Sequence, residues 1–477
     1  MWGWLILGLV LVVNAGLALI TMLRRPREIS ATWGWLLVLL ILPVIGFGFY
    51  GLFGRKLSTN KLNAMATQHR LGIDQMVAAQ REAVAVGQDL IGNHQAAGVP
   101  ELVRALLQVD AALITTLNDC QLISTRTAFE TRLFADLAAA QTQIHIEAYT
   151  IEPDATGRRL RTLLCAKARA GVRVRVVYDT FGSHRLSPKF WQPLILCGGS
   201  VEPFIATRFG RANPRINFRN HRKVIVIDGR IGYMGGFDIG SSPRRRPIAH
   251  DTELRLTGQA VAVLQARFFM DWNTTAKVQK VDFHPQDFPP APDTGTTTLQ
   301  IVAGGPEQPL EAIKLGYLRL LGMAKHSIWV QSPYFVPDDS LIDALAIAAN
   351  SGIDVRIMVP RRTNQPMMAR ATRFYLDRLV RVGAQIYYYN DDFLHNKTVV
   401  VDGQFLATGT ANLDIRSFRL NFELAAFIYD KTLAQQAAAL FTADMARATH
   451  YTHAMAKRKP RLTRLGEELS RLLTPIL

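Results

Sequence analysis

Residues 221–228 read HRKVIVID, and residues 395–402 read HNKTVVVD. Both segments have the spacing H-x-K-x4-D, which gives two sets of three residues: His221, Lys223 and Asp228, then His395, Lys397 and Asp402. Because lysine and aspartate each make up about one residue in twenty, the eleven histidines of the chain would produce only about 0.03 such matches by chance. The pattern indicates an internal repeat, and paired imidazole and ammonium groups suggest chemistry at a phosphate.

The repeat continues beyond these segments. Gly235 and Gly409 both follow their histidine by 14 residues, and Asp238 and Asn412 both follow it by 17. The β-branched runs end in Asp-Gly, which is typical of a strand that enters a tight turn. Since successive side chains of a strand point to opposite faces, each histidine is expected to face the same way as the lysine two residues later.

The segments upstream of both motifs predict the fold class. Residues 143–179 and 326–360 each read as an apolar strand, a polar turn, a helix and a second apolar strand, with Gly171 and Gly352 where the helices are expected to stop. A strand, helix, strand order implies a right-handed parallel crossover. We therefore predict an α/β protein with a duplicated α/β/α sandwich, in which two mixed sheets are flanked by helices.

The beginning of the chain is strongly apolar. Residues 2–22 and 33–53 carry no charge, and each is about as long as the roughly 20 residues that cross a bilayer as a helix. A cleaved signal peptide is the alternative, but the first stretch lacks a basic start and a small-residue exit, and a second apolar stretch follows at once. We therefore expect a retained transmembrane hairpin, which leaves the rest of the chain on one face of a membrane.

The side of the membrane is less well determined. The positive-inside comparison sets three basic residues in the turn against four after the hairpin, namely Arg24, Arg25 and Arg27 against Arg55, Lys56, Lys61 and Arg70. This margin, together with three cysteines that offer no disulfide framework, favours the cytoplasmic face only weakly.

The expected organisation has six segments. They are a transmembrane hairpin (1–58), a helical connector (59–118), a first catalytic half (119–278), a Pro-, Asp- and Thr-rich linker (279–298), a second half (299–450) and a basic amphipathic tail (451–477). In the tail, Lys457, Arg458, Lys459, Arg461 and Arg464 precede leucines at helical spacing, with Ile476 last. The tail is expected either to lie on an anionic bilayer or to pack its leucines on the body.

The net charge of +17 and the pI near 10.0 predict an anionic partner. Nucleic acid and anionic lipid both meet that description. The apolar beginning of the chain favours membrane lipid, so no nucleic acid is expected. The sequence assigns no oligomeric state.

Two histidines suit a phosphodiester exchange in two steps. A neutral imidazole attacks phosphorus, and a charged one protonates the leaving oxygen. Lys223 and Lys397 would neutralise the non-bridging oxygens, and the amide of Asn412 would add a hydrogen bond. Asp228 and Asp402 belong to the motif but end their strands, so we interpret them as turn or supporting residues.

Two further carboxylates are candidate partners for the imidazoles. Asp251 and Glu423 follow their respective histidines by 30 and 28 residues. The spacing alone does not decide which imidazole each would hold. The chemistry needs no cofactor, and the histidines and cysteines show no metal-ligand spacing.

Taken together, these motifs resemble the phospholipase D superfamily, and specifically bacterial cardiolipin synthases. The resemblance covers nearly the whole chain and is carried by WLLVLLILPVIGFGFYGLFGR, INFRNHRKVIVIDGRIGYMGGFDIG, SPYFVPDD and LHNKTVVVDGQFLATGTANLDIRSFRLNFE. It implies metal-free transfer of a phosphatidyl group from one phosphatidylglycerol to another. His221 would form the phosphatidyl-histidine and His395 would act as acid and then base, although these two roles could be reversed.

The resemblance also implies that Asp251 orients His395 and that Glu423 orients His221, each across the interface between the halves. One position departs from the family pattern, because Asp238 stands where asparagine is usual. A carboxylate there would repel a phosphate unless it is turned away, protonated, or paired with Lys223 or with an arginine of residues 243–246.

Other functions remain compatible with the motifs. One is a phospholipase D or a phosphatidyltransferase with another acceptor, and a second is a superfamily nuclease, which the apolar beginning of the chain disfavours. A different class is a non-catalytic scaffold that binds anionic lipid, for which Asp238 is the supporting feature.

Overall fold

The computed structural model describes residues 2–23, 29–43, 45–54, 74–88, 90–91, 98–204, 218–240, 249–275, 280–292, 295–363, 365–391 and 393–473. The basic residues compared for membrane orientation (Arg24, Arg25, Arg27, Arg55, Lys56, Lys61 and Arg70) lie outside the described residues. The same is true of residues 243–246 and Ile476.

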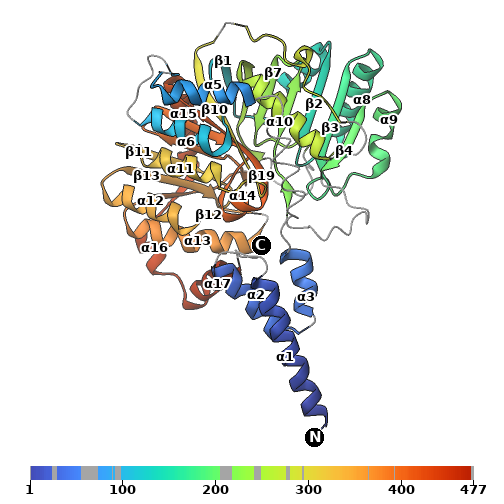
Figure 1. Ribbon diagram of the computed structural model, residues 1–477. Helices are drawn as coiled ribbons and strands as arrows, with labels where there is room; N and C mark the ends of the chain where they lie inside the picture. Colours follow the sequence, from blue (N-terminus) through green and yellow to red (C-terminus); the bar gives the residue numbers. More distant parts are fainter. Residues whose placement is uncertain are drawn as a thin grey trace.

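A mixed β-sheet runs through the centre of the body (Figure 1). In the described part of the chain it has sixteen strands, of which β5 (Arg219–Asn220) joins only at β19. The other strands follow in the order β20 (Ala448–Tyr451), β14 (Gln385–Tyr389), β13 (Asp354–Pro360), β11 (Ser327–Gln331), β16 (Thr398–Val401), β17 (Phe405–Gly409), β19 (Asn421–Ile428), β10 (Thr297–Gly304), β1 (Ile114–Ile123), β9 (Glu253–Gly258), β7 (Ile231–Gly235), β6 (Val224–Ile227), β2 (Gln143–Ala148), β3 (Arg173–Asp179) and β4 (Ser200–Phe204).

This continuity corrects the prediction of two separate sheets. β1 and β10 pair antiparallel, with Ile114 opposite Gln300, and so join what would otherwise be two open edges. An open edge leaves a row of backbone N–H and C=O groups unpaired, and the ladder between β1 and β10 satisfies them. The two strands of this ladder do not respect the expected segment boundaries. β1 begins inside the expected helical connector, and β10 begins inside the expected linker.

Both crossovers are confirmed. β2 and β3 are parallel and are connected by α8 (Ala155–Arg169), and β11 and β13 are parallel and are connected by α12 (Asp339–Asn350). Gly171 and Gly352 follow the two helices with φ of 88° and 87°, a backbone conformation that favours glycine.

The two Asp-Gly turns are also confirmed. β6 pairs with β7, and β16 pairs with β17, both antiparallel. Asp228 and Gly229 have φ of 55° and 64°, and Asp402 and Gly403 have φ of 54° and 59°. Two consecutive positive φ angles are the mark of a type I′ turn, whose twist matches that of the strands it joins.

Helices cover both faces of the sheet, as β6 illustrates. Ile225 and Ile227 belong to a buried cluster with α7 (Arg126–Ala139) and α8, whereas Val224 and Val226 pack with α10 (Ala260–Thr275). The remaining helices of the body are α5 (Asp74–Ala85), α6 (Val99–Asp110), α9 (Gln192–Leu196), α11 (Ala312–Leu321), α13 (Pro366–Arg381), α14 (Ile415–Arg419), α15 (Lys431–Met445), α16 (His453–Lys457) and α17 (Arg461–Leu473), with short 3-10 turns at Pro188–Trp191 and Pro285–Asp287.

The first helices project from the body (Figure 1). They are α1 (Trp2–Leu23), α2 (Ile29–Ile41), α3 (Ile45–Phe49) and a π-helical turn (Tyr50–Gly54). α1 and α2 are joined by a hydrogen bond of 2.8 Å from Asn14 Nδ2 to the carbonyl of Leu39. Among the described residues, we find no helix that combines the length and the apolarity needed to cross a membrane.

Candidate active site

The two histidines sit on short segments that precede β6 and β16, and backbone hydrogen bonds tie both to distant parts of the chain. β5 is parallel to β19, so the amide of His221 donates to the carbonyl of Phe422 over 2.9 Å. The strand β15 (Phe393–Leu394) is parallel to β8 (Ala249–His250), so the amide of His395 donates to the carbonyl of His250 over 2.8 Å. Each motif is therefore positioned by the segment that follows the other motif.

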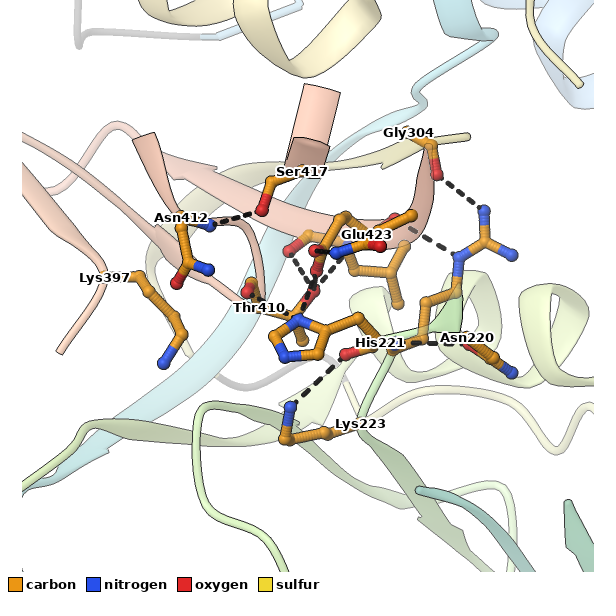
Figure 2. Close-up of polar contacts among 12 residues, drawn as sticks. Asn220, His221, Lys223, Gly304, Lys397, Thr410, Asn412, Ser417 and Glu423 are labelled. Atoms are coloured by element: carbon orange, nitrogen blue, oxygen red, sulfur yellow. Dashed lines mark hydrogen bonds and ion pairs between the residues drawn. The ribbon is translucent and has the colours of Figure 1, made fainter. Parts of the chain in front are cut away.

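The His221 imidazole is held by two acceptors. Its Nδ1 lies 2.9 Å from Glu423 Oε2 and 3.1 Å from the carbonyl oxygen of Thr410 (Figure 2). Because a carboxylate and a carbonyl only accept hydrogen bonds, Nδ1 carries the proton, and the lone pair of the neutral ring is on Nε2.

Glu423 is itself fully buried and fixed by neighbours. The hydroxyl of Thr410 donates to its Oε2 over 2.5 Å, and the amide of Asn421 donates to its Oε1 over 3.0 Å. Burial by itself would raise the pKa of Glu423, but the nearby His221 and these hydrogen bonds hold that pKa below its ordinary value. Glu423 is therefore an anion beside the imidazole.

The His395 imidazole pairs with Asp251. Nδ1 of His395 lies 2.6 Å from Asp251 Oδ2, and Lys397 Nζ lies 2.9 Å from the same ring nitrogen and 3.3 Å from the same oxygen. Burial, followed by the charge of Lys397, lowers the pKa of His395 to about 4 despite the opposing effect of Asp251. His395 is therefore neutral at pH 7.

Asp251 keeps its charge. Burial alone would raise the pKa of this carboxyl group, but Lys397 and His395 lower it below the ordinary value. The neighbouring glycine explains how the carboxylate fits, because a Cβ on Gly236 would overlap the Asp251 carboxylate.

The two lysines lie close enough for their charges to interact, since Lys223 contributes to the lowered pKa of Lys397. Lys397 has no exposed side-chain surface, and burial lowers its pKa. Lys223 Nζ donates to the backbone carbonyl of His221, in the same motif, over 3.4 Å and lies 5.4 Å from the centroid of the Tyr149 ring. The charge of Lys223 contributes to the pKa shifts of both His395 and Glu423, so the two motifs share one electrostatic site.

Asp238 and Asn412, which each follow their histidine by 17 residues, differ in their contacts. Asp238 Oδ1 lies 3.7 Å from Lys223 Nζ and accepts the backbone N–H of Thr150 over 3.2 Å. Of the arrangements considered for this carboxylate, the structure therefore has the ion pair with Lys223. Asn412 lies on the Lys397 side of the His221 ring in Figure 2. Its amide donates to Asp414 over 3.3 Å, and its buried Oδ1 has no hydrogen-bond partner among the described residues.

Asp228 and Asp402 do not join the other motif residues. Asp228 accepts the backbone N–H groups of residues 141–143 at 2.7–3.1 Å, and Asp402 accepts those of residues 325–327 at 2.7–2.9 Å. Partial burial tends to raise the pKa of Asp228, but its backbone hydrogen bonds lower it overall. Both carboxylates thus hold the first residues of a neighbouring strand, β2 or β11.

Arg222 is a residue that the sequence analysis overlooked. Its side chain is fully buried; Nη1 donates to both carboxylate oxygens of Asp271 at 2.8 and 2.9 Å, and Nη2 donates to Glu307 Oε1 at 3.1 Å. It also donates to the carbonyls of Glu423 (3.2 Å) and Gly304 (3.0 Å). The alternation of side chains along an extended segment could have indicated this role, because it points Arg222 to the face opposite that of His221 and Lys223.

In the part of the chain that the structure describes, no three His, Cys, Asp or Glu side chains are grouped so that they would hold a metal ion.

The chain is similar to known proteins over its whole length. Residues 317–445 match a family model described as cardiolipin synthase, PLD-like domain, and residues 12–55 match one described as phospholipase D-nuclease N-terminal. The major cardiolipin synthase of Bacillus subtilis is 39% identical over 478 residues, and a cardiolipin synthase of Listeria welshimeri is 39% identical over 477 residues. Both alignments cover 99% of this chain and 99% of the relative.

Among solved structures, a phosphatidylserine synthase of Haemophilus influenzae superimposes with a TM-score of 0.58. The match covers 79% of this chain and 100% of that protein, at 15% sequence identity. At this identity, the likeness concerns the fold alone.

Proposed function

Because this chain belongs to the cardiolipin synthase family of the phospholipase D superfamily and is a phosphatidyltransferase, we propose that it converts two phosphatidylglycerol molecules into cardiolipin and glycerol through a phosphatidyl-histidine. One observation carries the proposal. Two imidazoles, each with Nδ1 on a buried carboxylate, share a site with two lysines. That arrangement supplies one nucleophile, one proton carrier and positive charge for the phosphate oxygens.

In the first step, Nε2 of His221 attacks the phosphorus of the donor phosphatidylglycerol. A P–N bond forms, the P–O bond to the glycerol headgroup breaks, and the leaving oxygen takes a proton from Nε2 of His395. Glu423 favours this step because its negative charge stabilises the His221 ring as it becomes cationic. The lysines stabilise the charge that gathers on the non-bridging oxygens.

In the second step, a glycerol hydroxyl of another phosphatidylglycerol gives its proton to Nε2 of His395. The hydroxyl oxygen attacks phosphorus, the P–N bond breaks, and cardiolipin leaves with His221 and His395 in their starting states. Two anionic lipids must therefore pass through one site, which suits a site that carries two lysine charges.

The low pKa of His395 requires that this imidazole gain its proton when the donor binds. A phosphodiester placed between Lys223 and Lys397 offsets their positive charge, which otherwise lowers the pKa of His395. Substrate binding would thus raise the pKa of the proposed acid.

The same low pKa favours a second assignment, in which neutral His395 attacks and His221 carries the proton. A lipid with a p-nitrophenyl headgroup separates the two assignments, since nitrophenolate leaves without protonation. With His221 as nucleophile, His395→Ala releases a burst of nitrophenol and retains a labelled lipid on His221, whereas His221→Ala gives no burst. The opposite pattern assigns the nucleophile to His395.

The overall reaction is tested with phosphatidylglycerol as the sole lipid in detergent. Cardiolipin and free glycerol in equal amounts support the proposal. Phosphatidic acid as the only product would assign the site to hydrolysis, and cardiolipin formation that survives His221→Ala together with His395→Ala would remove both histidines from the mechanism.

We further propose that the protein is held in the bacterial cell membrane by a two-helix hairpin at residues 1–58, with the catalytic body on one face. The uncharged stretches 2–22 and 33–53 and the contact of Asn14 with Leu39 support this arrangement. Protease protection of residues 24–28 in sealed vesicles, compared with the body, tests it.

The body is proposed to consist of a connector (59–118), two duplicated halves (119–278 and 299–450), a linker (279–298) and a tail (451–477). The parallel crossover and the Asp-Gly hairpin that occur in both halves support the duplication. Two separately expressed pieces, 1–290 and 291–477, that regain activity only when combined would support these boundaries.

A further inference from the structure

Four leucines of the last helix, α17, point away from the protein. Leu462, Leu465, Leu469 and Leu472 are 82%, 51%, 53% and 61% exposed. At 100° per residue, these four positions fall on one stripe of the helix. These four leucines therefore do not pack on the body, which was one of the two arrangements expected for the tail. Four exposed leucines along one side of a helix form a continuous apolar patch, which differs from single apolar side chains scattered over a surface.

The face that does pack on the body is polar. Glu467 and Ser470 are 2% and 5% exposed. Lys459 Nζ lies 3.0 Å from Glu467 Oε2 and 2.9 Å from Asp377 Oδ2 on α13, which joins the end of the chain to the body. Arg471 lies 4.7 Å from the centroid of the Phe374 ring, also on α13.

These contacts fix the rotation of α17. Turning the leucines inward would remove Glu467 from Lys459 and leave Lys459 and Asp377 partly buried without this partner. Burial raises the pKa of Glu467, although Lys459 opposes this effect. The outward direction of the leucines is therefore a property of the folded body and not of a loose end.

Basic side chains border the leucine stripe. Lys457, Arg458, Arg461 and Arg464 are all exposed at the start of α17 or just before it. An apolar stripe with cations beside it matches the boundary between headgroups and acyl chains of an anionic bilayer, where leucines enter the apolar region and cations contact phosphates. Figure 1 shows α17 at the end of the body from which α1 projects.

We propose that α17 is a membrane-docking helix that inserts its leucine stripe into the interface of an anionic bilayer. It acts as a second attachment, independent of the N-terminal helices, and limits the rotation of the body relative to the membrane. A hairpin alone leaves the body free to turn about its connection, whereas two attachments fix which part of the body faces the lipid.

Hydrogen exchange on the full-length protein tests this docking. The protein is placed as a single copy in nanodiscs of phosphatidylcholine alone or of phosphatidylcholine with phosphatidylglycerol. We expect amide exchange in residues 461–473 to slow by about tenfold or more in the anionic discs. Leu465→Gln with Leu469→Gln should abolish the difference, while exchange in α13 stays as in wild type, which shows that the helix is still packed.

Leu196→Gln is the matched control, because Leu196 is 82% exposed at the end of α9 and lies outside the stripe. This variant should behave as wild type. Equal exchange of α17 in both kinds of disc would overturn the proposal. So would protection in detergent that increases with protein concentration, because it would assign the leucine stripe to a second copy of the chain.

The docking and the catalytic chemistry can fail separately. The paired leucine variant should retain cardiolipin synthesis in detergent micelles, where no bilayer is present, and lose it in vesicles. Loss of activity in micelles as well would show that the leucines support the fold, and would also overturn the proposal.

Discussion

The ammonium group of Lys223 lies 3.7 Å from a carboxylate oxygen of Asp238, so the site already contains an anion beside one of its two lysines. The corresponding position near Lys397 is the neutral Asn412. The surroundings of Lys223 and of Lys397 therefore attract a phosphate unequally, although the two motifs are otherwise alike. Asp238 is 25% exposed in its side chain, which leaves it accessible to a substrate that enters the site.

Replacing Asp238 by Asn removes this anion with little change in size. We expect the KM for phosphatidylglycerol to fall about tenfold, because a like charge about 4 Å away in a partly exposed site is worth on the order of 1–4 kcal/mol. Steady-state kinetics in mixed micelles measure the effect, with the exposed Asp343→Asn as the control of equal charge change. A rise in KM would instead show that Asp238 binds a hydroxyl of the substrate.

Variants in which Glu423 or Asp251 is neutral should be slower catalysts but should still fold. Glu423→Gln and Asp251→Asn keep the shape of the side chain but no longer favour the charged imidazole. We expect kcat to drop by about 10²–10⁴-fold in each variant, a range that orienting carboxylates reach in histidine-based catalysis. Single-turnover assays with matched circular dichroism spectra check this, and a loss below threefold would argue against an orienting role.

The lowered pKa of His395 gives stability a specific pH dependence. In the unfolded chain this imidazole gains a proton near pH 6.5, whereas in the folded chain it does so only near pH 4. The unfolded state therefore binds more protons between these values, and stability is lost as the pH falls from 6.5 to 4. The difference corresponds to about 3 kcal/mol.

His395→Gln should flatten this loss. The melting temperature of the variant in detergent, measured from pH 7 to pH 4, should decline less steeply than that of wild type. His184→Gln, at an exposed histidine, serves as the control and should leave the slope unchanged. Parallel curves for wild type and His395→Gln would contradict the expectation.

Asp228 and Asp402 should affect stability more than chemistry. Replacement of either by Ala removes a carboxylate that accepts three backbone N–H groups and places a less tolerant residue at positive φ. We expect a loss of about 1–3 kcal/mol for Ala and a smaller loss for Asn, which tolerates this conformation and keeps one acceptor. Denaturation midpoints give the order, while kcat per folded molecule should stay within about threefold of wild type.

Much of the local structure follows from local sequence. The Asp-Gly turns after residues 227 and 401 and the glycines after α8 and α12 are confirmed, because each depends on a backbone conformation that few residue types adopt. The repeated motif also predicted that each histidine faces the same way as the lysine two residues later, and Lys397 Nζ does lie 2.9 Å from His395 Nδ1, although both motif pairs precede their strands. These features involve neighbours within a few residues of one another.

The features that the sequence analysis missed depend on distant parts of the chain. The pairing of Ile114 with Gln300 joins two edges separated in sequence by the whole of the first half and the linker, and nothing in either strand specifies that partner. The carbonyl of Thr410, which with Glu423 fixes the His221 tautomer, is a backbone atom that every residue possesses. The low pKa of His395 depends on burial, which arises only after the whole body has assembled.

The backbone N–H of His221 donates to the carbonyl of Phe422 and that of His395 donates to the carbonyl of His250, so each imidazole is positioned by the segment that follows the other motif. A motion that separates β5 from β19 and β8 from β15 would therefore displace both rings. Under the proposed mechanism, the nucleophile and the proton carrier would then leave the phosphate at the same time, and not one after the other.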